Sequence, residues 1–372
     1  MATRLVAGCM SGTSLDGIDA ALVAVVGTGL TMTATVRRVV SRPLGRLAAP
    51  LRELAAQRPM TAGDIAALAR EFGLLHLDLL RELIGNERID LVAVHGQTVF
   101  HAPPVSWQLI DAAPLARGLG VPVVFDLRAA DLAAGGHGAP ITPLADYVLF
   151  RDEGETRAVL NLGGYCNYTW LPAALPSRAG EVDPSRPSAA SAAIRGGDIC
   201  ACNHVLDAAA RALFGVPFDD QGRRALAGTV RFEPRDALVA MLRAQSTAGR
   251  SLGTGDELHG WIEQNRGRFR PADLVRSVCD AIAMVVLERV GAADRLILAG
   301  GGAKNLALCN ALAQHGANPI SLSDEFGVPT QGREAAAIAV LGALCADGAP
   351  ITLPQITGCT DPPPRAGTWI YP

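Results

Sequence analysis

The sequence predicts an α/β protein with two domains of similar size, long enough to enclose a cleft. Its 372 residues exceed what one ordinary core accommodates. Apolar strand candidates alternate with helical segments and end in polar loops, a pattern typical of an α/β layer with its site at the strand ends. Two glycine-tipped strand–turn–strand units stand about one domain apart, as an internal duplication would place them. We therefore expect a first domain over residues 1–155 and a second over residues 156–372.

The first glycine-tipped unit is a hairpin near the start of the chain. Apolar residues 4–9 and 18–26 flank a small polar tip, which ends in the carboxylates Asp16 and Asp19. The glycines of the tip remove side-chain bulk, so backbone N–H groups of residues 11–14 can approach an anion closely. The two carboxylates repel phosphate unless a divalent cation lies between them. The tip fits a phosphate-binding turn, and equally a tight glycine hairpin whose Asp residues cap turns.

Helix and strand patterns alternate through the rest of the first domain. Residues 61–84 have helical periodicity, and the buried strand candidate 91–94 runs directly into the polar segment 95–101. A second strand candidate, residues 121–125, leads into the glycine-rich segment 126–140. Polar groups are therefore expected together where these two strands end.

The second domain begins with the second hairpin, residues 158–171, whose tip also contains glycine. The Ala-, Ser- and Pro-rich segment 172–195 has low complexity and is expected to be a flexible loop. Helices are then expected at about residues 203–213, 235–245 and 271–290. Residues 295–306 have the pattern of a strand, a triple-glycine turn and a helix start, which suits either a ligand pressed against the backbone or a closely packed βα turn.

Composition and charge restrict the class of partner. A net charge of −3 without a Lys/Arg-rich run argues against nucleic acid and against an anionic membrane surface, so a small molecule is expected. The hairpin tip interrupts the first apolar residues, and no later run reaches membrane-spanning length without Gly or charge, so a cytoplasmic location is expected. Lys304 is the only lysine, which excludes a Walker-type P-loop. The eight cysteines lack paired spacing and are expected to be reduced core residues.

Six short motifs, in order over nearly the whole chain, carry a family resemblance. They occupy residues 10–19, 95–98, 131–140, 161–164 with Asn167, 300–302 with Asn305, and 332–335. In these motifs the chain resembles the anhydro-N-acetylmuramic acid kinases, a bacterial family of the actin, Hsp70 and sugar-kinase superfamily. The resemblance implies two actin-like (ribonuclease H-like) domains with ATP in the cleft between them. It also implies phosphorylation of the sugar O6 coupled to hydrolytic opening of a 1,6-anhydro bridge, which yields N-acetylmuramate 6-phosphate.

The resemblance also implies roles for individual residues in holding the nucleotide. The two hairpins would clasp the phosphates, and the triple-glycine turn would lie near the adenosine. The implied nucleotide-binding residues are Gly12, Thr13, Ser14, Leu15, Asp16, Gly17, Ile18, Asp19, Asn161, Gly163, Gly164, Asn167, Gly300, Gly301, Gly302 and Asn305. Mg²⁺ would neutralise phosphate charge near Asp16 and Asp198.

By motif position the catalytic base is Asp131, a carboxylate on a glycine-rich loop that would take a proton from water attacking the anomeric carbon. Glu334 matches a family glutamate thought to help hold that water. Candidate sugar contacts are His95, Gln97, Gln108, His137 and Gly138. Each of these residues also has a structural interpretation that does not depend on the resemblance. Asp131 could cap a turn or a helix, and Glu334 could stabilise a helix start. His95 could be a structural histidine at a strand end.

The chain departs from the family pattern in two places. The family usually has Asp-Thr-Gly-Pro-Gly-Asn where this chain has Asp198-Ile-Cys-Ala-Cys-Asn203, and it has Gln where this chain has His137. Cys200 and Cys202 in place of glycine predict a loop of different shape. Burial of both cysteines in the core is a better interpretation than a metal site with His204, because such a site would lack a fourth ligand.

These departures keep two alternatives open. One is a kinase for a different sugar or anhydro-sugar, and the other is a catalytically silent nucleotide-binding sensor. Members of the family tend to dimerise, so the resemblance also implies a homodimer.

Overall fold

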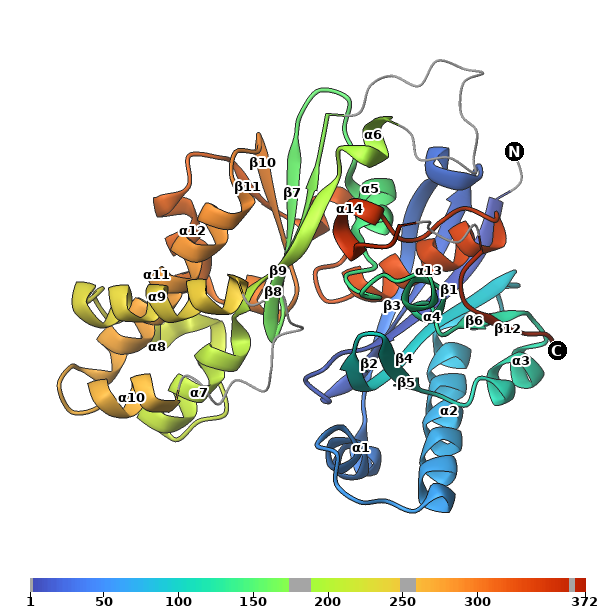
Figure 1. Cartoon of the computed structure of the whole chain (residues 1–372), viewed down its shortest axis with the longest axis horizontal. Helices are drawn as coiled ribbons and strands as arrows, with labels where there is room; N and C mark the ends of the chain where they lie inside the picture. The colour runs from blue at the N-terminus through green and yellow to red at the C-terminus, as the bar shows by residue number, and fades with distance from the viewer. Residues whose placement is uncertain (1–2, 174–188, 248–258, 361–364) are drawn as a thin grey trace. The chain divides into compact units, whose positions relative to one another are not determined.

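The computed structural model describes residues 3–173, 189–247, 259–360 and 365–372 (Figure 1). Contacts between residues divide the chain into unit 1, which comprises Met1–Glu153, Ala174–Arg195 and Phe326–Pro372, and unit 2, which comprises Gly154–Ala173 and Gly196–Glu325. The first division lies close to the expected boundary after residue 155. In contrast to the expected second domain of residues 156–372, the last segment belongs with unit 1. Most of the segment 172–195, expected to be a flexible loop, lies outside the described residues.

Unit 1 is built on a seven-stranded mixed sheet in the order β12-β6-β4-β1-β2-β3, with β5 paired to β4. Neighbours β1, β2 and β3 are antiparallel, whereas β4 is parallel to β1 and β6 is parallel to β4. The strands are β1 Thr3–Ser11, β2 Gly17–Val26, β3 Thr33–Pro43, β4 Leu91–Ala102, β5 Val105–Leu109, β6 Val123–Phe125 and β12 Thr368–Ile370. The two strands on either side of the first tip are thus confirmed as the hairpin β1–β2.

The last segment joins unit 1 for two physical reasons. Strand β12 pairs antiparallel with β6 at the sheet edge. Helix α13 (Arg333–Ala346) lies directly on β1, because a Cβ added at Gly8 would be 2.2 Å from the Ala335 carbonyl oxygen. In Figure 1 the red helix α13 accordingly lies beside the blue strand β1, although the two are far apart in the sequence. Backbone contacts this close require glycine at position 8.

The opposite face of the sheet carries the main core of unit 1. Side chains alternate along a strand, so Ala7 and Cys9 of β1 face away from α13 and pack in a core with Phe72 and Leu79 of α2. Helix α2 begins after Thr61, whose hydroxyl accepts a hydrogen bond from the Asp64 N–H at 3.2 Å, and it confirms the predicted helix at 61–84. The helices of unit 1 are η1 Gly29–Thr31, η2 Gly45–Leu47, α1 Ala48–Ala55, α2 Ala62–Ile84, α3 Ala113–Leu119, α4 Ala129–Ala133, α5 Pro143–Phe150, α6 Ala189–Ala192, α13 and α14 Pro354–Thr357.

Unit 2 repeats the plan of unit 1 on a five-stranded sheet in the order β11-β10-β7-β8-β9. Strands β7 and β8 form the second hairpin, β10 is parallel to β7, and β11 is parallel to β10. The strands are β7 Arg157–Leu162, β8 Tyr165–Leu171, β9 Arg195–Ala201, β10 Arg295–Ala299 and β11 Ile320–Leu322. The sheet order β9-β8-β7-β10-β11 matches β3-β2-β1-β4-β6, which confirms the α/β class with two units of actin-like plan.

Helices of unit 2 cover a core of aliphatic and cysteine side chains. The three predicted helices are present as α7 Asn203–Phe214, α9 Phe232–Thr247 and α11 Pro271–Val290. The others are η3 Asp220–Gly222, α8 Arg223–Leu226, α10 His259–Asn265, η5 Gly301–Lys304, α12 Leu306–His315 and η6 Ser323–Phe326. All eight cysteines are free thiols and seven are buried, as predicted. Within the described ranges, no helix has both the length and the apolar character needed to cross a membrane.

Candidate active site

The backbone of the first hairpin tip is fixed by contacts with the rest of unit 1. Leu15 has a positive φ of 54°, a strained conformation for this residue, and its side chain is buried in the core of unit 1. Arg52 of α1 donates from Nη2 to the Leu15 carbonyl oxygen at 3.0 Å. These contacts fix the tip backbone in one conformation, which is what a turn that binds an anion through its N–H groups requires.

Gln97 of β4 fixes the same tip from the neighbouring strand. Its side chain is fully buried, its Oε1 accepts from Ser11 Oγ at 2.6 Å, and its Nε2 donates to the Gly12 carbonyl oxygen at 3.2 Å. The parallel pairing of β1 with β4 places Ser11 opposite Gln97. The structure therefore uses the amide of Gln97 to support the hairpin, and its predicted contact with a sugar stays a prediction.

The outer side of the first tip is polar and open. Thr13, Ser14 and Asp16 are exposed, and Ser14 Oγ donates to Asp16 Oδ1 at 2.9 Å. A Cβ added at Gly17 would meet the Arg42 carbonyl oxygen at 2.9 Å, so packing explains that glycine. At Gly12 the nearest atom would be at 3.4 Å, so the fold itself does not demand a glycine there. The predicted contact of Gly12 with a nucleotide is compatible with this packing and stays a prediction.

The carboxylates of this region fit a hard cation by their oxygen chemistry. Asp19 is on β2 and accepts a hydrogen bond from Ser41 Oγ of β3, whereas Asp16 is exposed at the tip. The second predicted metal residue, Asp198, is exposed on β9. Among the described residues, no three His, Cys, Asp or Glu side chains are grouped as a metal site. Mg²⁺ needs no such group, because it commonly binds one or two carboxylates together with phosphates and water.

Asp131 lies in α4 and is enclosed by the glycine-rich loop that follows it. The residue is 1% exposed, its Oδ2 accepts from the Gly138 N–H at 2.7 Å, and its Oδ1 accepts from Thr357 Oγ1 at 2.7 Å. A Cβ added at Gly136 would be 2.1 Å from Oδ2, so this glycine is required for the loop to wrap the carboxylate. Two donors orient the group, and each oxygen keeps a second lone pair for a water or substrate.

Half-buried Arg128 and buried His95 form a hydrogen-bonded pair beside the loop of Asp131. Arg128 donates from Nε to His95 Nε2 at 3.0 Å and from Nη1 to the Gly138 carbonyl oxygen at 2.6 Å. Because Nε2 of His95 accepts, its Nδ1 carries the proton and donates to the Gly96 carbonyl oxygen at 2.9 Å. Burial, and next the charge of Arg128, lower the pKa of His95 to about 3, so the ring is neutral. Both ring nitrogens are engaged, and the predicted sugar contact of His95 stays a prediction.

The β4–β5 hairpin brings further polar groups to this region. Gln108 is 7% exposed, its Nε2 donates to Ser106 Oγ at 2.8 Å, and its Oε1 is buried without a hydrogen-bond partner. His101 Nδ1 contacts the same Ser106 Oγ at 2.8 Å, and burial, Arg128 and His137 lower the pKa of His101 to about 4. An acceptor left unpaired in the interior is costly. An N–H or O–H donor of a bound sugar would satisfy Gln108 Oε1.

Glu334, in the first turn of α13, faces charges from the same region. Burial has the largest influence and raises its pKa; Arg333 and Arg128 oppose that rise, and Asp19 and Asp146 add to it. Glu334 is thus within electrostatic range of the first hairpin, through Asp19, and of the Asp131 loop, through Arg128. Both predicted catalytic carboxyl groups belong to unit 1.

In unit 2, the triple-glycine turn packs against the end of β7. Gly300 has φ +82°, and a Cβ added there would be 2.6 Å from Asn161 Oδ1; one added at Gly302 would be 2.8 Å from Leu162 Cβ. At Gly301 the nearest atom would be Asn203 Nδ2 at 3.6 Å, an ordinary van der Waals contact, so packing does not require glycine there. Asn305 caps α12, because its Oδ1 accepts from the Leu308 N–H at 3.1 Å. Packing and capping therefore explain three of these four residues, and Gly301 is the one free to meet a ligand.

The second hairpin tip is held by the start of α7. Asn203 donates from its backbone N–H to the Gly163 carbonyl oxygen at 3.0 Å and from Nδ2 to the Leu162 carbonyl oxygen at 3.1 Å. A Cβ added at Gly164 would be 2.5 Å from His204 Nε2, so this ring lies against the tip. Asn167 is on β8 opposite Asn161 and is half-buried.

The departure at residues 198–203 is accommodated by the core. Cys200 and Cys202 are fully buried, and burial raises the pKa of Cys200 to about 12. Cys202 has φ −123°, so it needs no conformation that only glycine adopts. The prediction of buried cysteines is confirmed. The alternative was a metal site formed with His204. Among the described residues, no group of three or more His, Cys, Asp or Glu side chains supports it.

Five residues make side-chain contacts that were not predicted from the sequence. They are Ser11, Arg128, Thr357, Asn203 and Arg333. Arg128 is three residues before Asp131 and precedes a helix at a strand end, a local signal that points to it. Thr357 carries no such signal, because its partner is 226 residues away in the chain.

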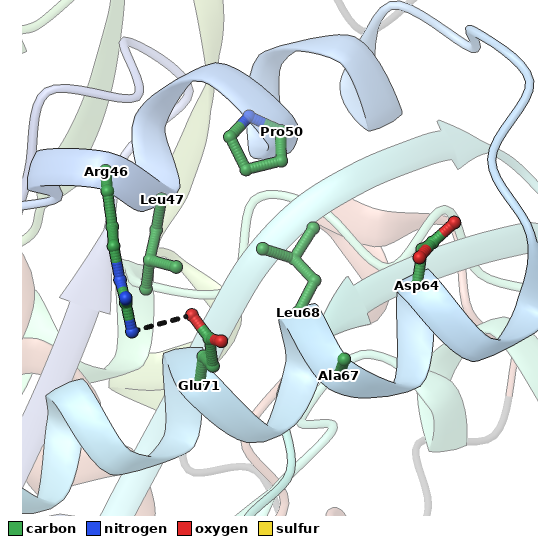
Figure 2. Close-up of a pocket in the computed structure, with 7 residues that line it drawn as sticks. All are labelled: Arg46, Leu47, Pro50, Asp64, Ala67, Leu68 and Glu71. Atoms are coloured by element: carbon green, nitrogen blue, oxygen red, sulfur yellow. Dashed lines mark ion pairs between the residues drawn. The ribbon is translucent and has the colours of Figure 1, made fainter.

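A separate pocket of about 260 Å³ lies between α1 and the first half of α2 (Figure 2). Its lining residues are Arg46, Leu47, Pro50, Asp64, Ala67, Leu68 and Glu71. Figure 2 shows the Arg46–Glu71 ion pair at one side of it, with the two side chains 3.1 Å apart. None of the predicted site residues lines this pocket.

Comparison with known families gives one match over nearly the whole chain. Residues 4–368 match the family model described as anhydro-N-acetylmuramic acid kinase. A protein of that name from Salinibacter ruber is 34% identical, over 96% of this chain and 94% of its own length. Proteins of the same name from Gloeobacter violaceus and Bordetella pertussis are 33% and 35% identical, over 96% and 95% of this chain and 96% and 93% of their own lengths.

Solved structures are similar at lower levels. The activator of 2-hydroxyisocaproyl-CoA dehydratase from Clostridium difficile, with bound ADPNP, overlaps with a TM-score of 0.44 at 13% identity, over 91% of this chain and 94% of its own. A ROK family glucokinase from Streptomyces griseus overlaps with a TM-score of 0.37 at 14% identity, over 91% and 99% of the two chains. Overlaps this low say nothing about which substrate the chain uses.

Proposed function

Since this chain belongs to the anhydro-N-acetylmuramic acid kinase family, we propose that it uses ATP to phosphorylate O6 of 1,6-anhydro-N-acetylmuramic acid, with opening of the anhydro bridge by water. The product is N-acetylmuramate 6-phosphate, and the role is recycling of cell-wall sugar. The observation that supports this proposal best is Asp131, a buried carboxylate oriented by the Gly138 N–H and the Thr357 hydroxyl. A silent sensor has no need of an oriented buried base.

The residues around the two hairpin tips suit ATP with Mg²⁺. We assign the phosphates to the backbone of both tips, with Gly12 as the glycine that leaves room at the first tip, and the adenosine to the triple-glycine turn at Gly301. Asp16 and Asp198 would hold Mg²⁺, and the ion would neutralise phosphate charge. Because Lys304 is the only lysine, backbone N–H groups rather than a P-loop lysine carry this role.

The proposed reaction has two chemical steps, and Asp131 accepts the proton in the first of them. A carboxylate oxygen of Asp131 accepts a proton as a water oxygen attacks the anomeric carbon, and the bond from that carbon to O6 breaks. The released O6 then attacks the γ-phosphate of ATP, and ADP leaves. Glu334 helps to hold the water, while Arg128, fixed by His95, supports the loop through the Gly138 carbonyl oxygen. The protein's contribution is to align three reactants.

The sugar contacts belong to the same group of residues. We propose that Gln108 Oε1 accepts from an N–H or O–H of the sugar, and that His137 and Gly138 line the same place. ATP and the amino sugar are the partners that we propose, with no nucleic acid or membrane. A homodimer is a further proposal, which light scattering of the purified protein tests.

The decisive experiment is incubation with ATP, Mg²⁺ and 1,6-anhydro-N-acetylmuramic acid, followed by mass spectrometry of the sugar. The expected product gains both phosphate and water. Gain of phosphate without water would indicate an ordinary sugar kinase. Binding of ATP without turnover of this sugar, or of a panel of other amino sugars, would favour the sensor.

A further inference from the structure

Arg333 and Asp146 form an ion pair that is sealed inside unit 1. Arg333, the first residue of α13, is 1% exposed, and Asp146 of α5 is 0% exposed. Arg333 donates from Nε to Asp146 Oδ1 at 2.9 Å and from Nη2 to Asp146 Oδ2, while its Nη1 is buried without a partner. Burying two charges has a large desolvation cost, and a well-packed apolar pair is often as stable. Stability alone is therefore a weak reason for this pair.

The pair holds a helix start that backbone contacts also confine. A Cβ added at Gly332 would be 2.5 Å from Val39 Cγ2 of β3, and one added at Gly8 of β1 would be 2.2 Å from the Ala335 carbonyl oxygen. The first turn of α13 is thus packed between β1, β3 and α5 without room to shift. Glu334 stands between Arg333 and Ala335, so these contacts fix the backbone from which its side chain extends.

Charged groups on four elements act on Glu334. Arg333 of its own helix and Arg128 ahead of α4 favour the ionised carboxylate, whereas Asp19 of β2 and Asp146 of α5 oppose it. Burial is the largest influence and raises the pKa of Glu334. The two charges of the pair act on Glu334 in opposite directions, so removal of either one leaves the other unbalanced.

We propose that Arg333 and Asp146 are positioning residues for Glu334: the pair anchors the start of α13, holds the Glu334 carboxyl group in place, and keeps the charge around it balanced. The inference rests on the proposed function, in which Glu334 helps to hold the attacking water. In this role neither member of the pair contacts a reacting atom. The pair acts only through Glu334.

The test compares ion pairs at the two ends of one helix. Asp146→Asn keeps the side-chain volume and removes the charge beside the start of α13. Its matched control is Asp347→Asn at the other end, where Asp347 pairs with Arg4 at 2.5 Å and 3.0 Å. Asp347 is 13 residues after Glu334 along α13, which puts this control about 20 Å from Glu334. Both variants lose a two-bonded ion pair of α13, so a merely structural effect appears in both.

Asp146→Asn is expected to lower kcat by about 10²-fold, the effect of a misplaced group of about 1 Å, with the KM for ATP unchanged. With the opposing charge of Asp146 gone, Arg333 favours the Glu334 carboxylate, so its titration and the acidic limb of the kcat profile move to lower pH. The titration is followed by carboxyl ¹³C NMR of protein labelled at Glu and assigned with Glu334→Gln. Asp347→Asn is expected to lower the melting temperature but to leave both kcat and the Glu334 titration unchanged.

The inference is overturned if Asp146→Asn lowers the melting temperature as Asp347→Asn does, yet leaves kcat and the Glu334 titration unchanged. If Asp146→Asn does not fold, Arg333→Lys takes its place. Lysine keeps the positive charge but cannot make the two hydrogen bonds that the guanidinium of Arg333 makes to Asp146. This variant is expected to lower kcat with little change in the titration, and an unchanged kcat would sink the proposal. If the wild-type protein never turns over the sugar but Asp146→Asn still moves the Glu334 titration, the proposed function fails while the link between the pair and Glu334 stands.

Discussion

The hairpin tips of the two units have the same place in matching sheets but carry different chemistry. The first tip carries exposed Asp16, has Asp19 on the adjoining strand, and is supported by Gln97 of β4. The second tip has no acidic residue between Asn161 and Asn167 and is supported by Asn203 at the start of α7. Each tip is therefore held by an amide side chain that bonds its backbone, but only the first brings negative charge to it.

This difference separates the work of the two units. Asp131, Glu334 and the Arg128–His95 pair all belong to unit 1, so the proposed proton transfer and handling of water have no counterpart in unit 2. The strand order is thus duplicated, whereas the residues proposed for the chemistry lie in unit 1. Changes to the carboxylates of unit 1 should alter kcat and the dependence on Mg²⁺, whereas changes to the backbone of either tip and to the residues of the second tip should alter ATP affinity.

The largest expected effect is that of Asp131→Asn, which keeps the shape of the base and removes its ability to accept a proton. We expect kcat to fall by about 10²–10⁴-fold, with the Kd for ATP unchanged. In unit 2, Asn161→Ala should raise the Kd for ATP more than it lowers kcat. ADP release and calorimetric titration with ATP measure the two quantities.

Asp126→Asn is the matched control for Asp131→Asn, because Asp126 is in the same segment and has a positive φ of 52°, which Asn tolerates. It should leave turnover nearly unchanged. Turnover of Asp131→Asn at the wild-type rate would remove the proposed base and, with it, the division of labour between the units.

Glycine substitutions should separate folding from binding in both units. Gly300→Ala places a Cβ 2.6 Å from Asn161 Oδ1 at a φ of +82°, so it should cost about 2–4 kcal/mol of stability. Gly301→Ala, whose Cβ would be at an ordinary contact distance of 3.6 Å from Asn203 Nδ2, should leave the free energy of unfolding within about 0.5 kcal/mol and weaken ATP binding. Denaturant unfolding and calorimetric titration distinguish the two effects.

Unit 1 offers the same comparison at its own tip. Gly17→Ala would meet the Arg42 carbonyl oxygen at 2.9 Å and should destabilise, whereas Gly12→Ala should weaken ATP binding alone. If Gly12→Ala and Gly301→Ala both bind ATP as the wild-type protein does, neither the first tip nor the triple-glycine turn approaches the nucleotide through these glycines.

How far the sequence predicts this fold depends on how local each signal is. Helix α2, the second hairpin and the strand–turn–helix of residues 295–306 follow from periodicity and glycine within short windows, and they were predicted to within a few residues. The return of residues 326–372 to unit 1 depends on β12, three residues that pair with β6, and on the backbone contact of α13 with Gly8. No local pattern encodes such distant contacts.

The same distinction holds for the candidate site. Asp131 and Glu334 could be proposed because each is in a short motif of its own. Thr357, which bonds Asp131, and Arg333, which pairs with Asp146 187 residues away, became visible only when the chain folded. Cys200 and Cys202 predict a loop of different shape, which stays a prediction, and both side chains pack in the core of unit 2, whose spaces no local pattern encodes.

Acid should destabilise unit 1 more than unit 2. Burial lowers the pKa of His76 to about 4, and burial with Arg128 lowers that of His95 to about 3, both from 6.5. An unfolded chain binds protons at these histidines below pH 6.5 while the folded unit does not, so stability is complete above pH 6.5 and falls as the pH drops toward the folded values. From pH 6.5 to 5 each should cost up to about 2 kcal/mol.

The measurement is urea unfolding at pH 7 and pH 5, followed by pulsed hydrogen exchange at one labelling pH, which reports on each unit separately. His76→Leu should remove part of the acid sensitivity of unit 1, and His315→Asn in unit 2 serves as its control. Equal losses in both units would contradict the assignment of this sensitivity to the buried histidines.

The smallest expected effect bears most directly on the contrast between the tips. Asp16→Asn removes the one exposed carboxylate of the first tip, so the Mg²⁺ concentration for half-maximal rate should rise about tenfold, the equivalent of about 1.4 kcal/mol. Asp198→Asn makes the same change on β9 of unit 2. If Mg²⁺ is held chiefly through the acidic tip, the shift for Asp198→Asn is the smaller of the two, because Mg²⁺ retains several waters and one protein carboxylate suffices. Equal shifts would mean that both units hold the ion, and that the acidic tip of unit 1 differs from its neutral counterpart for another reason.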